Sequence, residues 1–348
     1  MKKLLALLLV LALLTGCTAA PAAQLQSTTP SSSTTVTDPS NPDPSVTEPP
    51  ASEPPATEPP ASEPPATEPP ATEPPVADPP VIQLPVSGSL TVHFIDVGQA
   101  DCALLECNGE YALIDGGRTT ETAIVTDYLT AQGVDRLSLV VGTHPHEDHI
   151  GGLPGVLNQF KADTVWTSAT PYYNGYINAF LLAARNNAQE LVYPQVGDTF
   201  LLGGAVITML GPVKTDYEDA NDLSLVLMVT YGNTRFLFTG DMEQIAETDL
   251  LDSGAVVKAD VLKVGHHGSY SSTSYHFLRE VAPTYAVISV GSNNEYGHPH
   301  DSTVSKLKNA DVIIYRTDKM YNIVATSDGT DISFSWDNAY AKPWKPAA

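Results

Sequence analysis

The sequence predicts an α/β fold, because strand patterns and helix patterns alternate along one stretch of chain. They follow one another over about 260 residues, from residue 82 onward. Interleaved strands and helices over that length are typical of a single layered α/β domain. The composition changes sharply near residue 80, so only the later part of the chain is expected to form a packed core.

The expected strands are short segments, apolar or alternating, that are bounded by turn residues. They cover residues 90–97, 102–106, 111–114, 137–141, 206–210, 223–231, 235–238, 261–264, 286–290, 321–325 and 332–336. Asn108-Gly109 and Gly232-Asn233 are expected to turn the chain between neighbouring strands. Helices are expected at residues 120–132 and 275–281.

The first residues are expected to form an export signal. Lys2 and Lys3 precede an apolar run of eleven residues, 4–14, whereas a membrane-spanning helix needs roughly 20. The run ends in Leu14-Thr15-Gly16-Cys17, which resembles the bacterial lipobox. That resemblance implies a lipoprotein signal peptide at residues 1–16, acylation of Cys17, and an extracytoplasmic protein anchored to the bacterial cell membrane. An ordinary signal peptide with a chance cysteine is the alternative.

Residues 17–81 are expected to be a disordered linker. Ser, Thr, Pro and Ala dominate at first, and a five-residue unit such as Ala51-Ser52-Glu53-Pro54-Pro55 then repeats up to residue 80. Proline fixes φ and the glutamates repel one another, so the repeat favours extended polyproline II, with a reach on the order of 110 Å at about 3.1 Å per residue. Such a segment can carry a domain away from a membrane. A glycosylated stalk or a plain spacer is the alternative.

The charge of the chain argues against tight nucleic-acid binding. The formal net charge is −23. Residues 18–80 hold nine acidic and no basic residues, and residues 81–348 hold 31 acidic and 15 basic residues. This domain lacks the basic footprint of a strong nucleic-acid binder. Nucleic acid is therefore expected only as a substrate and not as a tight ligand, and no protein partner is evident.

Two cysteines remain once Cys17 is assigned to lipid. Cys102 and Cys107 are five residues apart on one expected strand, so they point to opposite faces of it. A disulfide would need their Cα atoms within about 7 Å, which an extended segment does not allow. Two buried thiols are therefore expected.

The most informative segment is Thr143-His144-Pro145-His146-Glu147-Asp148-His149. It follows an apolar strand and precedes a glycine turn that opens a helix, and catalytic groups gather in loops at strand ends. Three imidazoles and a carboxylate within six residues are nitrogen and oxygen donors suited to zinc, manganese or iron. The first two histidines can turn towards one metal, while Asp148 and His149 face a second.

This motif resembles the signature of the metallo-β-lactamase superfamily, and the resemblance covers nearly all of residues 88–336. It implies an αββα sandwich in residues 82–340. It also implies two divalent metal ions, zinc in the first place with manganese or iron as alternatives. By the same resemblance, Asp115 orients the metal-binding loop from behind the ligands, and Asp241 bridges both metals.

Three further segments narrow the resemblance: Asp96-Val97-Gly98-Gln99-Ala100-Asp101, His266-His267-Gly268-Ser269 and Gly297-His298-Pro299. They are similar to the soluble domain of the ComEC-like competence DNA-uptake proteins and to phosphorylcholine esterases. Many superfamily members place another histidine ligand between the first motif and the bridging aspartate. Here no histidine lies between His149 and Asp241.

The resemblance therefore implies that later histidines complete the site. His267 is the expected ligand of the first metal and His298 that of the second. His266 is the expected neighbour that packs or hydrogen-bonds, although the choice between His266 and His267 stays open. His300 is a candidate ligand, or a candidate hydrogen-bond partner of a ligand, but a histidine without a role in the site is the favoured interpretation.

Other polar residues are assigned less directly. Asp96 and Asp222 are expected to contact the ligands or the substrate, with a turn and strand start as the alternative for Asp222. His93, in an expected strand, and His276, in an expected helix, are interpreted as structural.

The expected function is metal-dependent hydrolysis. Metal ions bridged by Asp241 hold a water and lower its pKa towards neutrality, so hydroxide attacks without a protein nucleophile. Asp148 acts as ligand and proton acceptor, which makes Asp148 and Asp241 the expected catalytic residues. The ComEC-like resemblance implies cleavage of phosphodiesters, with extracellular DNA as the leading substrate.

Two alternatives stay open. A zwitterionic phosphorylcholine ester suits an acidic surface better than DNA does, because duplex affinity depends on basic residues that release counterions. A metal-binding or ligand-binding module without turnover is the other alternative, and the missing middle histidine is its support. The chain lacks the membrane channel of complete ComEC-like proteins, so a role in DNA uptake would need separate partners.

Overall fold

The computed structural model describes residues 86–169 and 171–337. The expected signal peptide, the acylation site Cys17 and the linker at residues 17–81 lie outside these ranges. Helices within the described ranges are all too short or too polar to span a bilayer. Every described helix and strand belongs to the domain expected at residues 82–340.

The strands form two mixed sheets, one of eight strands in the order β15-β14-β1-β2-β3-β4-β5-β6 and one of seven in the order β13-β12-β11-β10-β9-β8-β7. The first consists of β1 (Leu90–Phe94), β2 (Ala103–Cys107), β3 (Glu110–Ile114), β4 (Leu137–Gly142), β5 (Ala162–Thr167), β6 (Ala188–Val192), β14 (Ile323–Ser327) and β15 (Ile332–Trp336). The second consists of β7 (Thr199–Leu202), β8 (Ala205–Gly211), β9 (Val226–Tyr231), β10 (Thr234–Phe238), β11 (Val261–Lys263), β12 (Tyr285–Ile288) and β13 (Ile313–Arg316).

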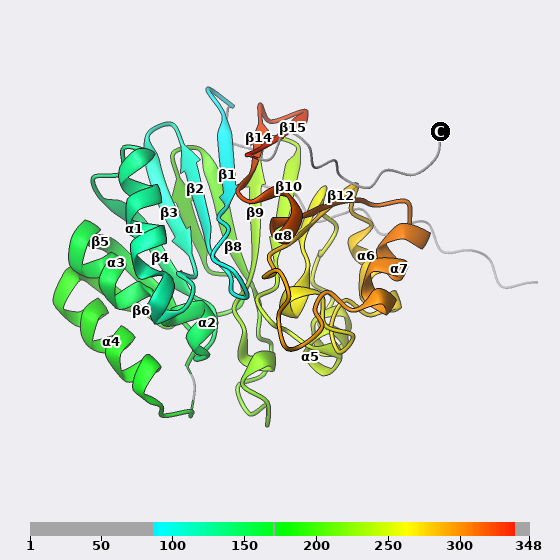
Figure 1. The fold of residues 1–348 in the computed structure, drawn as a ribbon, viewed down its shortest axis with the longest axis horizontal. Coiled ribbons are helices and arrows are strands. Elements are labelled where there is room, and N and C mark those ends of the chain that lie inside the picture. Colours follow the sequence, from blue (N-terminus) through cyan, green and yellow to red (C-terminus); the bar gives the residue numbers. More distant parts are fainter. Residues whose placement is uncertain (1–85, 170, 338–348) are drawn as a thin grey trace, which may run out of the picture. The chain divides into compact units, whose positions relative to one another are not determined.

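Helices flank the pair of sheets on both sides (Figure 1). Those beside the first sheet are α1 (Thr122–Ala131), α3 (Leu153–Phe160) and α4 (Gly175–Asn187), and those beside the second are α5 (Gln244–Asp252), α6 (Tyr275–Val281) and α7 (Asp301–Asn309). Short helical segments lie in the connections: η1 (Thr119–Glu121), α2 (Glu147–Ile150), η2 (Asn221–Leu223), η3 (Gly265–Gly268) and α8 (Thr317–Met320). The αββα sandwich expected from the sequence is confirmed.

Strand alternation explains how this layering buries its apolar residues. Leu105 faces the core between the sheets, whereas its neighbour Leu104 faces the core under α1, α3 and α4. In the second sheet, Phe236 faces the core between the sheets and Leu237 faces the core under the other three helices. Because successive side chains of a strand point to opposite faces, apolar runs without polar alternation are what a sheet covered on both sides requires.

The cysteines and the first hairpin follow the expected pattern. Cys107 lies in the core between the sheets and Cys102 in the core beneath the helices, and both are free buried thiols, as predicted. Asn108 and Gly109 join β2 to β3 with positive φ values of 52° and 82°. Two consecutive left-handed residues give the turn twist that suits a tight hairpin.

Parallel strands place the functional loops together. β3 pairs with β4 in parallel, and β10, β11 and β12 form a parallel set in the other sheet. The carboxyl ends of parallel strands meet at one edge of a sheet, where α/β folds place their binding sites. The loops after β3, β4, β10 and β11 carry the residues described below.

Among the element boundaries that differ from the sequence prediction, two are explained by tertiary contacts that shorten a strand. The strand expected at 90–97 stops at Phe94, and the backbone NH of Asp96 instead donates to the side chain of Asn322. The strand expected at 223–231 begins only at Val226, since residues 221–223 form η2 and the NH of Leu225 donates to the carbonyl of Thr143.

His93 on β1 is structural, as predicted: it is buried, and its Nδ1 lies 3.0 Å from the hydroxyl of Tyr128. Burial lowers the pKa of His93 to about 4. A lowered pKa in the folded state gives stability above pH 6.5 that is lost as the pH falls from about 6.5 towards 4. This residue alone should therefore cost about 2 kcal/mol of unfolding free energy between pH 7 and pH 5.

We predict that His93→Gln reduces the loss of stability between pH 7 and pH 5 by that amount. Urea unfolding of both proteins, each stripped of metal by a chelator, measures the difference. A variant that loses stability between these pH values as steeply as the parent would contradict the assignment.

Candidate metal centre

The carboxylate of Asp115 organises the loop that follows β4. It accepts hydrogen bonds from the backbone NH and the hydroxyl of Thr143, at 2.9 and 2.8 Å. Its Oδ2 also lies 2.8 Å from Nδ1 of His149. Asp115 has a left-handed backbone with φ of 59°, so the chain turns sharply after β3 to bring the carboxylate beneath this loop. The contact with Nδ1 leaves Nε2 of His149 as the free donor atom.

The two histidines at the start of the loop lie against each other. Nε2 of His144 is 3.1 Å from Nδ1 of His146. His144 is buried and His146 is half-buried. Burial lowers the pKa of His144 well below its usual value, and the charge of His149 adds to this shift. His144 is thus held neutral, the form that binds a metal.

The loop after β10 brings Asp241 to the same place. Gly240 has a φ of 52°, and a Cβ there would lie 2.8 Å from Ser224, so only glycine fits this approach. The backbone NH of Asp241 donates to the hydroxyl of Ser224 at 3.0 Å. That hydroxyl also lies 3.3 Å from Nδ1 of His144, so Ser224 fixes the position of Asp241 relative to His144.

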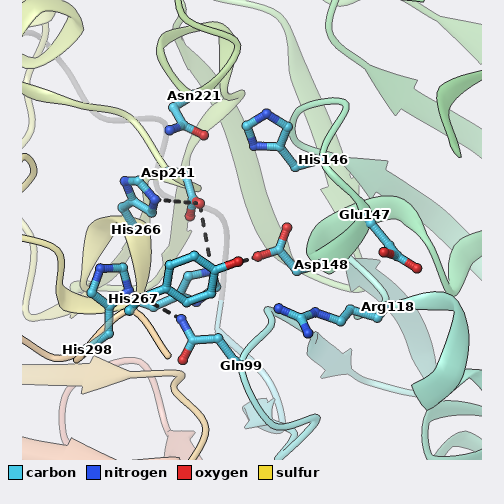
Figure 2. Close-up of a pocket in the computed structure, with 11 residues that line it drawn as sticks. Gln99, Arg118, His146, Glu147, Asp148, Asn221, Asp241, His266, His267 and His298 are labelled. Carbon is cyan, nitrogen blue, oxygen red and sulfur yellow. Dashed lines mark hydrogen bonds and ion pairs between the residues drawn. The ribbon is translucent and has the colours of Figure 1, made fainter. Parts of the chain in front are cut away.

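Asp241 stands at the centre of the imidazoles (Figure 2). Its Oδ1 is 3.2 Å from Nε2 of His149. Its Oδ2 is 3.9 Å from Nε2 of His144 and 3.7 Å from Nε2 of both His266 and His267. A buried carboxylate that faces four imidazoles is placed to bridge two cations.

The loop after β11 supplies two histidines in a strained backbone. His266 and His267 have positive φ values of 48° and 52°, which for non-glycine residues is uncommon and clusters at functional sites. Nε2 of His267 lies 3.4 Å from Asp148. His266 instead lies with its Nδ1 3.0 Å from the carboxylate of Glu243. The strained turn therefore aims the two rings at different partners.

The donor atoms fit metal ions. His144, His149 and Asp241 offer ligand atoms that lie within 4.8 Å of one another, and so do Asp148, His149 and His267. Among the buried polar atoms with no hydrogen-bond partner in the described ranges are Nε2 of His149, Oδ1 of Asp241 and Nε2 of His267. Buried polar atoms are normally paired, so these converging unpaired donors indicate a cation site. Mixed imidazole and carboxylate donors suit zinc, manganese or iron.

The electrostatics of the cluster also favour cations. Burial lowers the pKa of His267, but the charges of Asp241 and Asp101 outweigh it and raise that pKa to about 10. Burial likewise opposes charge on His149, yet Asp241 and Asp115 raise its pKa well above the usual value. The carboxylates thus attract positive charge to this point, and metal ions can replace the protons.

A buried ion pair lies behind His267. Nζ of Lys263 is 2.7 Å from Oδ2 of Asp101, and both side chains are almost fully buried. The other oxygen of Asp101 lies 3.2 Å from Nδ1 of His267, which is also 3.1 Å from the carbonyl of Ser289. These contacts fix the ring so that Nε2 points at Asp148.

A pocket of about 430 Å³ opens over the donors, which is within the range of small-molecule sites. It is lined by Gln99, Arg118, His146, Glu147, Asp148, Asn221, Asp241, His266, His267, Tyr296 and His298. Figure 2 shows Arg118, Glu147 and Asp148 on one side of the pocket and His266 and His298 on the opposite side. A substrate in this pocket would lie directly against the candidate ligands.

The sequence profile of the metallo-beta-lactamase superfamily matches residues 95–292, more than half of the chain. The chain belongs to this superfamily. Its relatives include ComE operon protein 3 of Bacillus subtilis (strain 168), which is 30% identical over 246 residues, 66% of this chain and 32% of that protein. Competence protein ComA of Neisseria gonorrhoeae is 31% identical over 226 residues, 64% of this chain and 30% of that protein.

The resemblance to the competence proteins is thereby confirmed, and the chain spans about a third of the length of these relatives. Among solved structures, the metallo-beta-lactamase fold protein YhfI from Bacillus subtilis is 13% identical. It covers 68% of this chain and 100% of its own, with a TM-score of 0.49.

The superfamily motif residues come together, and the position of His267 bears on its expected assignment. By resemblance to the superfamily, His267 was expected to bind the first metal together with His144 and His146. In the structure His267 forms one group of converging donors with Asp148 and His149, because the strained turn directs its Nε2 to Asp148. His267 also lies 3.7 Å from Asp241 and forms a second group of converging donors with Asp101 and Asp241, so its assignment to the first metal stays a prediction.

The histidines near residue 300 lie further from the donor clusters. Nδ1 of His298 is 3.3 Å from the side-chain amide of Gln99, and the residue lines the pocket but belongs to none of the groups of converging donors in the described ranges. Nδ1 of His300 accepts from the NH of Tyr270, so it supports the histidine loop from behind. His298 as a ligand of the second metal stays a prediction.

The two aspartates assigned less directly lie behind the site. Asp222 accepts from the NH of Glu243 and so fixes the segment after Asp241. Asp96 accepts from the NH of Gly98 and is not among the residues that line the pocket. Both contacts are to backbone, which is what a turn-forming aspartate provides.

Sequence reasoning missed the pair formed by Asp101 and Lys263. A signal was present, because Lys263 is a lone charge in the apolar segment 261–264. A buried charge requires a partner. The sequence alone does not identify that partner, since Asp101 lies 162 positions away on a loop of the other sheet.

We predict that Asp241→Asn lowers the bound metal by at least about half, because the shared carboxylate of a two-metal site holds both ions. Metal per chain is measured by plasma mass spectrometry after dialysis. His276→Ala, on an exposed helix position, is the control and should keep the full content. Unchanged metal in Asp241→Asn would contradict the bridging role.

We predict that Lys263→Met destabilises the protein by about 3 to 5 kcal/mol, because it removes the lysine that pairs with the buried carboxylate of Asp101 and leaves only His267 beside that charge. Urea unfolding measures the loss. The double variant Lys263→Met/Asp101→Asn should regain part of it, since the charge is then removed as well. If Lys263→Met is as stable as the parent, the ion pair between Lys263 and Asp101 does not stabilise the protein by this amount.

Proposed function

We propose that this chain is an extracytoplasmic, lipid-anchored, metal-dependent phosphodiesterase. The observation that carries the proposal is the buried carboxylate of Asp241, which faces imidazoles from two loops at the floor of an open pocket. The similarity to competence protein ComA and to ComE operon protein 3 supports a nucleic-acid phosphodiester as one substrate class. The anchor at Cys17 and the extracytoplasmic location are part of the same proposal.

The residues of the site have different roles in the proposed hydrolysis. Two divalent ions held by these imidazoles and carboxylates would supply Lewis acidity and would let water act as the nucleophile near neutral pH. Asp148 is half-buried and lines the pocket, so its carboxylate can accept a proton from water that enters. Asp115 and Ser224 hold His149 and His144 in fixed orientations, which keeps the donors organised before substrate arrives.

The acidic surface favours small substrates over long duplexes. The chain has 40 acidic and 17 basic residues, and Arg118 is the sole lysine or arginine that lines the pocket in the described ranges. Duplex affinity grows with the number of phosphates that basic residues neutralise. A small phosphodiester, including a phosphorylcholine ester of a cell surface, is therefore the second candidate substrate.

We predict that the metal-loaded full-length protein hydrolyses bis(p-nitrophenyl) phosphate. His146→Ala and Asp241→Asn should each lower kcat/KM by about a hundredfold or more, as loss of metal-held charge stabilisation does. Release of p-nitrophenolate measures the rate, and His276→Ala is the control. Full metal loading with no hydrolysis of any ester would reject the enzyme and favour a binding module.

The same protein separates the two substrate classes. Cleavage of single-stranded DNA and of p-nitrophenyl phosphorylcholine is compared between 50 and 500 mM salt, and we expect a shallow salt dependence because few phosphates are neutralised. Faster turnover of the choline ester at all salt concentrations would favour the cell-surface substrate over DNA.

A further inference from the structure

Arg118 occupies a fixed position at the edge of the pocket. It follows the turn of Asp115, and Gly117 before it has a left-handed φ of 68°. The NH of Gly117 donates to the carbonyl of Asp101 at 2.9 Å, and its own carbonyl accepts from the NH of Gly152 at 2.9 Å. The backbone that carries Arg118 is thus tied to the ligand loops. Its side chain is half-buried.

The guanidinium of Arg118 has no ion pair or hydrogen bond to any residue within 86–169 and 171–337. Three of the other five arginines in these ranges, Arg136, Arg279 and Arg316, each pair with a carboxylate. Acidic residues do lie close by, because Glu147 and Asp148 line the same side of the pocket (Figure 2). An arginine that stays unpaired beside two carboxylates requires an explanation.

Both neighbouring carboxylates are held by other residues. The hydroxyl of Tyr176 hydrogen-bonds to Glu147, a contact that raises the pKa of Tyr176. Asp148 lies 3.4 Å from Nε2 of His267. Figure 2 shows the guanidinium of Arg118 directed into the pocket. Its five donors are therefore available to a ligand rather than to the protein.

The rest of the pocket outside the donor cluster provides no second fixed cation. Gln99, Asn221 and Tyr296 are neutral groups that donate or accept hydrogen bonds. A guanidinium matches phosphate oxygens with two parallel hydrogen bonds, which gives geometric selectivity as well as attraction. The pocket therefore offers one contact for one anionic group beside the metal ligands.

We propose that Arg118 binds a non-bridging oxygen of the substrate phosphate and thereby selects anionic phosphoesters over neutral esters. This inference rests on the proposed function and deepens it by naming the substrate class. Arg118 is a substrate-binding residue and holds no metal. One contact of this kind is enough for a small phosphodiester. The excess of acidic residues also favours a small substrate, because it disfavours binding of a long polyanion.

The test compares Arg118→Ala and Arg118→Lys with the parent, all as full-length, metal-loaded proteins. For the anionic bis(p-nitrophenyl) phosphate, Arg118→Ala should raise KM about 10- to 100-fold. Arg118→Lys should raise KM less, because lysine keeps the positive charge but cannot form two parallel hydrogen bonds to the phosphate. For the neutral p-nitrophenyl acetate, kcat/KM should stay within about twofold. Arg185→Ala, at an exposed position of α4, is the matched control and should change neither.

A separate measurement keeps the inference independent of turnover. Calorimetry with inorganic phosphate should show at least about tenfold weaker binding to Arg118→Ala than to the parent, at equal metal content. If the parent binds phosphate through Arg118 but hydrolyses no diester, the proposed function fails and the anion site stands. Equal losses on the anionic and neutral esters, or phosphate binding that is unchanged in Arg118→Ala, would overturn the inference.

Discussion

One buried carboxylate, that of Asp115, is the constraint on which the rest of the site depends. It receives the NH and hydroxyl of Thr143 and contacts Nδ1 of His149, so a single side chain sets the start and the end of the motif loop. Because Nδ1 of His149 is occupied, its Nε2 is the atom that faces Asp241. A loop of this kind positions its donors before any ion arrives, which reduces the reorganisation that binding requires.

Carboxylates outnumber lysine and arginine side chains in this buried region, and this excess of negative charge favours the binding of cations. Asp115, Asp148 and Asp241 converge on the imidazoles, while the buried Lys263 is taken by Asp101. Isolated buried charges are strongly unfavourable, so the carboxylates need either protonated histidines or metal ions. The same excess of negative charge lies beneath a pocket whose lining includes Arg118. We therefore expect an anionic substrate to bind between the metal ions and this arginine.

The layered fold and the ligand loop were predictable from sequence because both are local signals. Apolar runs give the doubly covered strands, and the dense donor motif lies within seven residues. The ends of the strands were less predictable. For example, β9 begins only at Val226 because the NH of Leu225 donates to the carbonyl of Thr143 in another loop. The grouping of His267 with the second ligand pair depends on its left-handed backbone, and the role of Lys263 depends on a partner in the other sheet. Neither is encoded in spacing along the chain.

The central claim is that Asp241 lies between two metal ions. Anomalous X-ray scattering from crystals of the zinc- or manganese-loaded protein tests it most directly. We predict two peaks about 3.5 to 4 Å apart on either side of the Asp241 carboxylate, one near His144 and one near His267. A single peak remote from Asp241, or no peak in protein that has been shown to be folded, would contradict it.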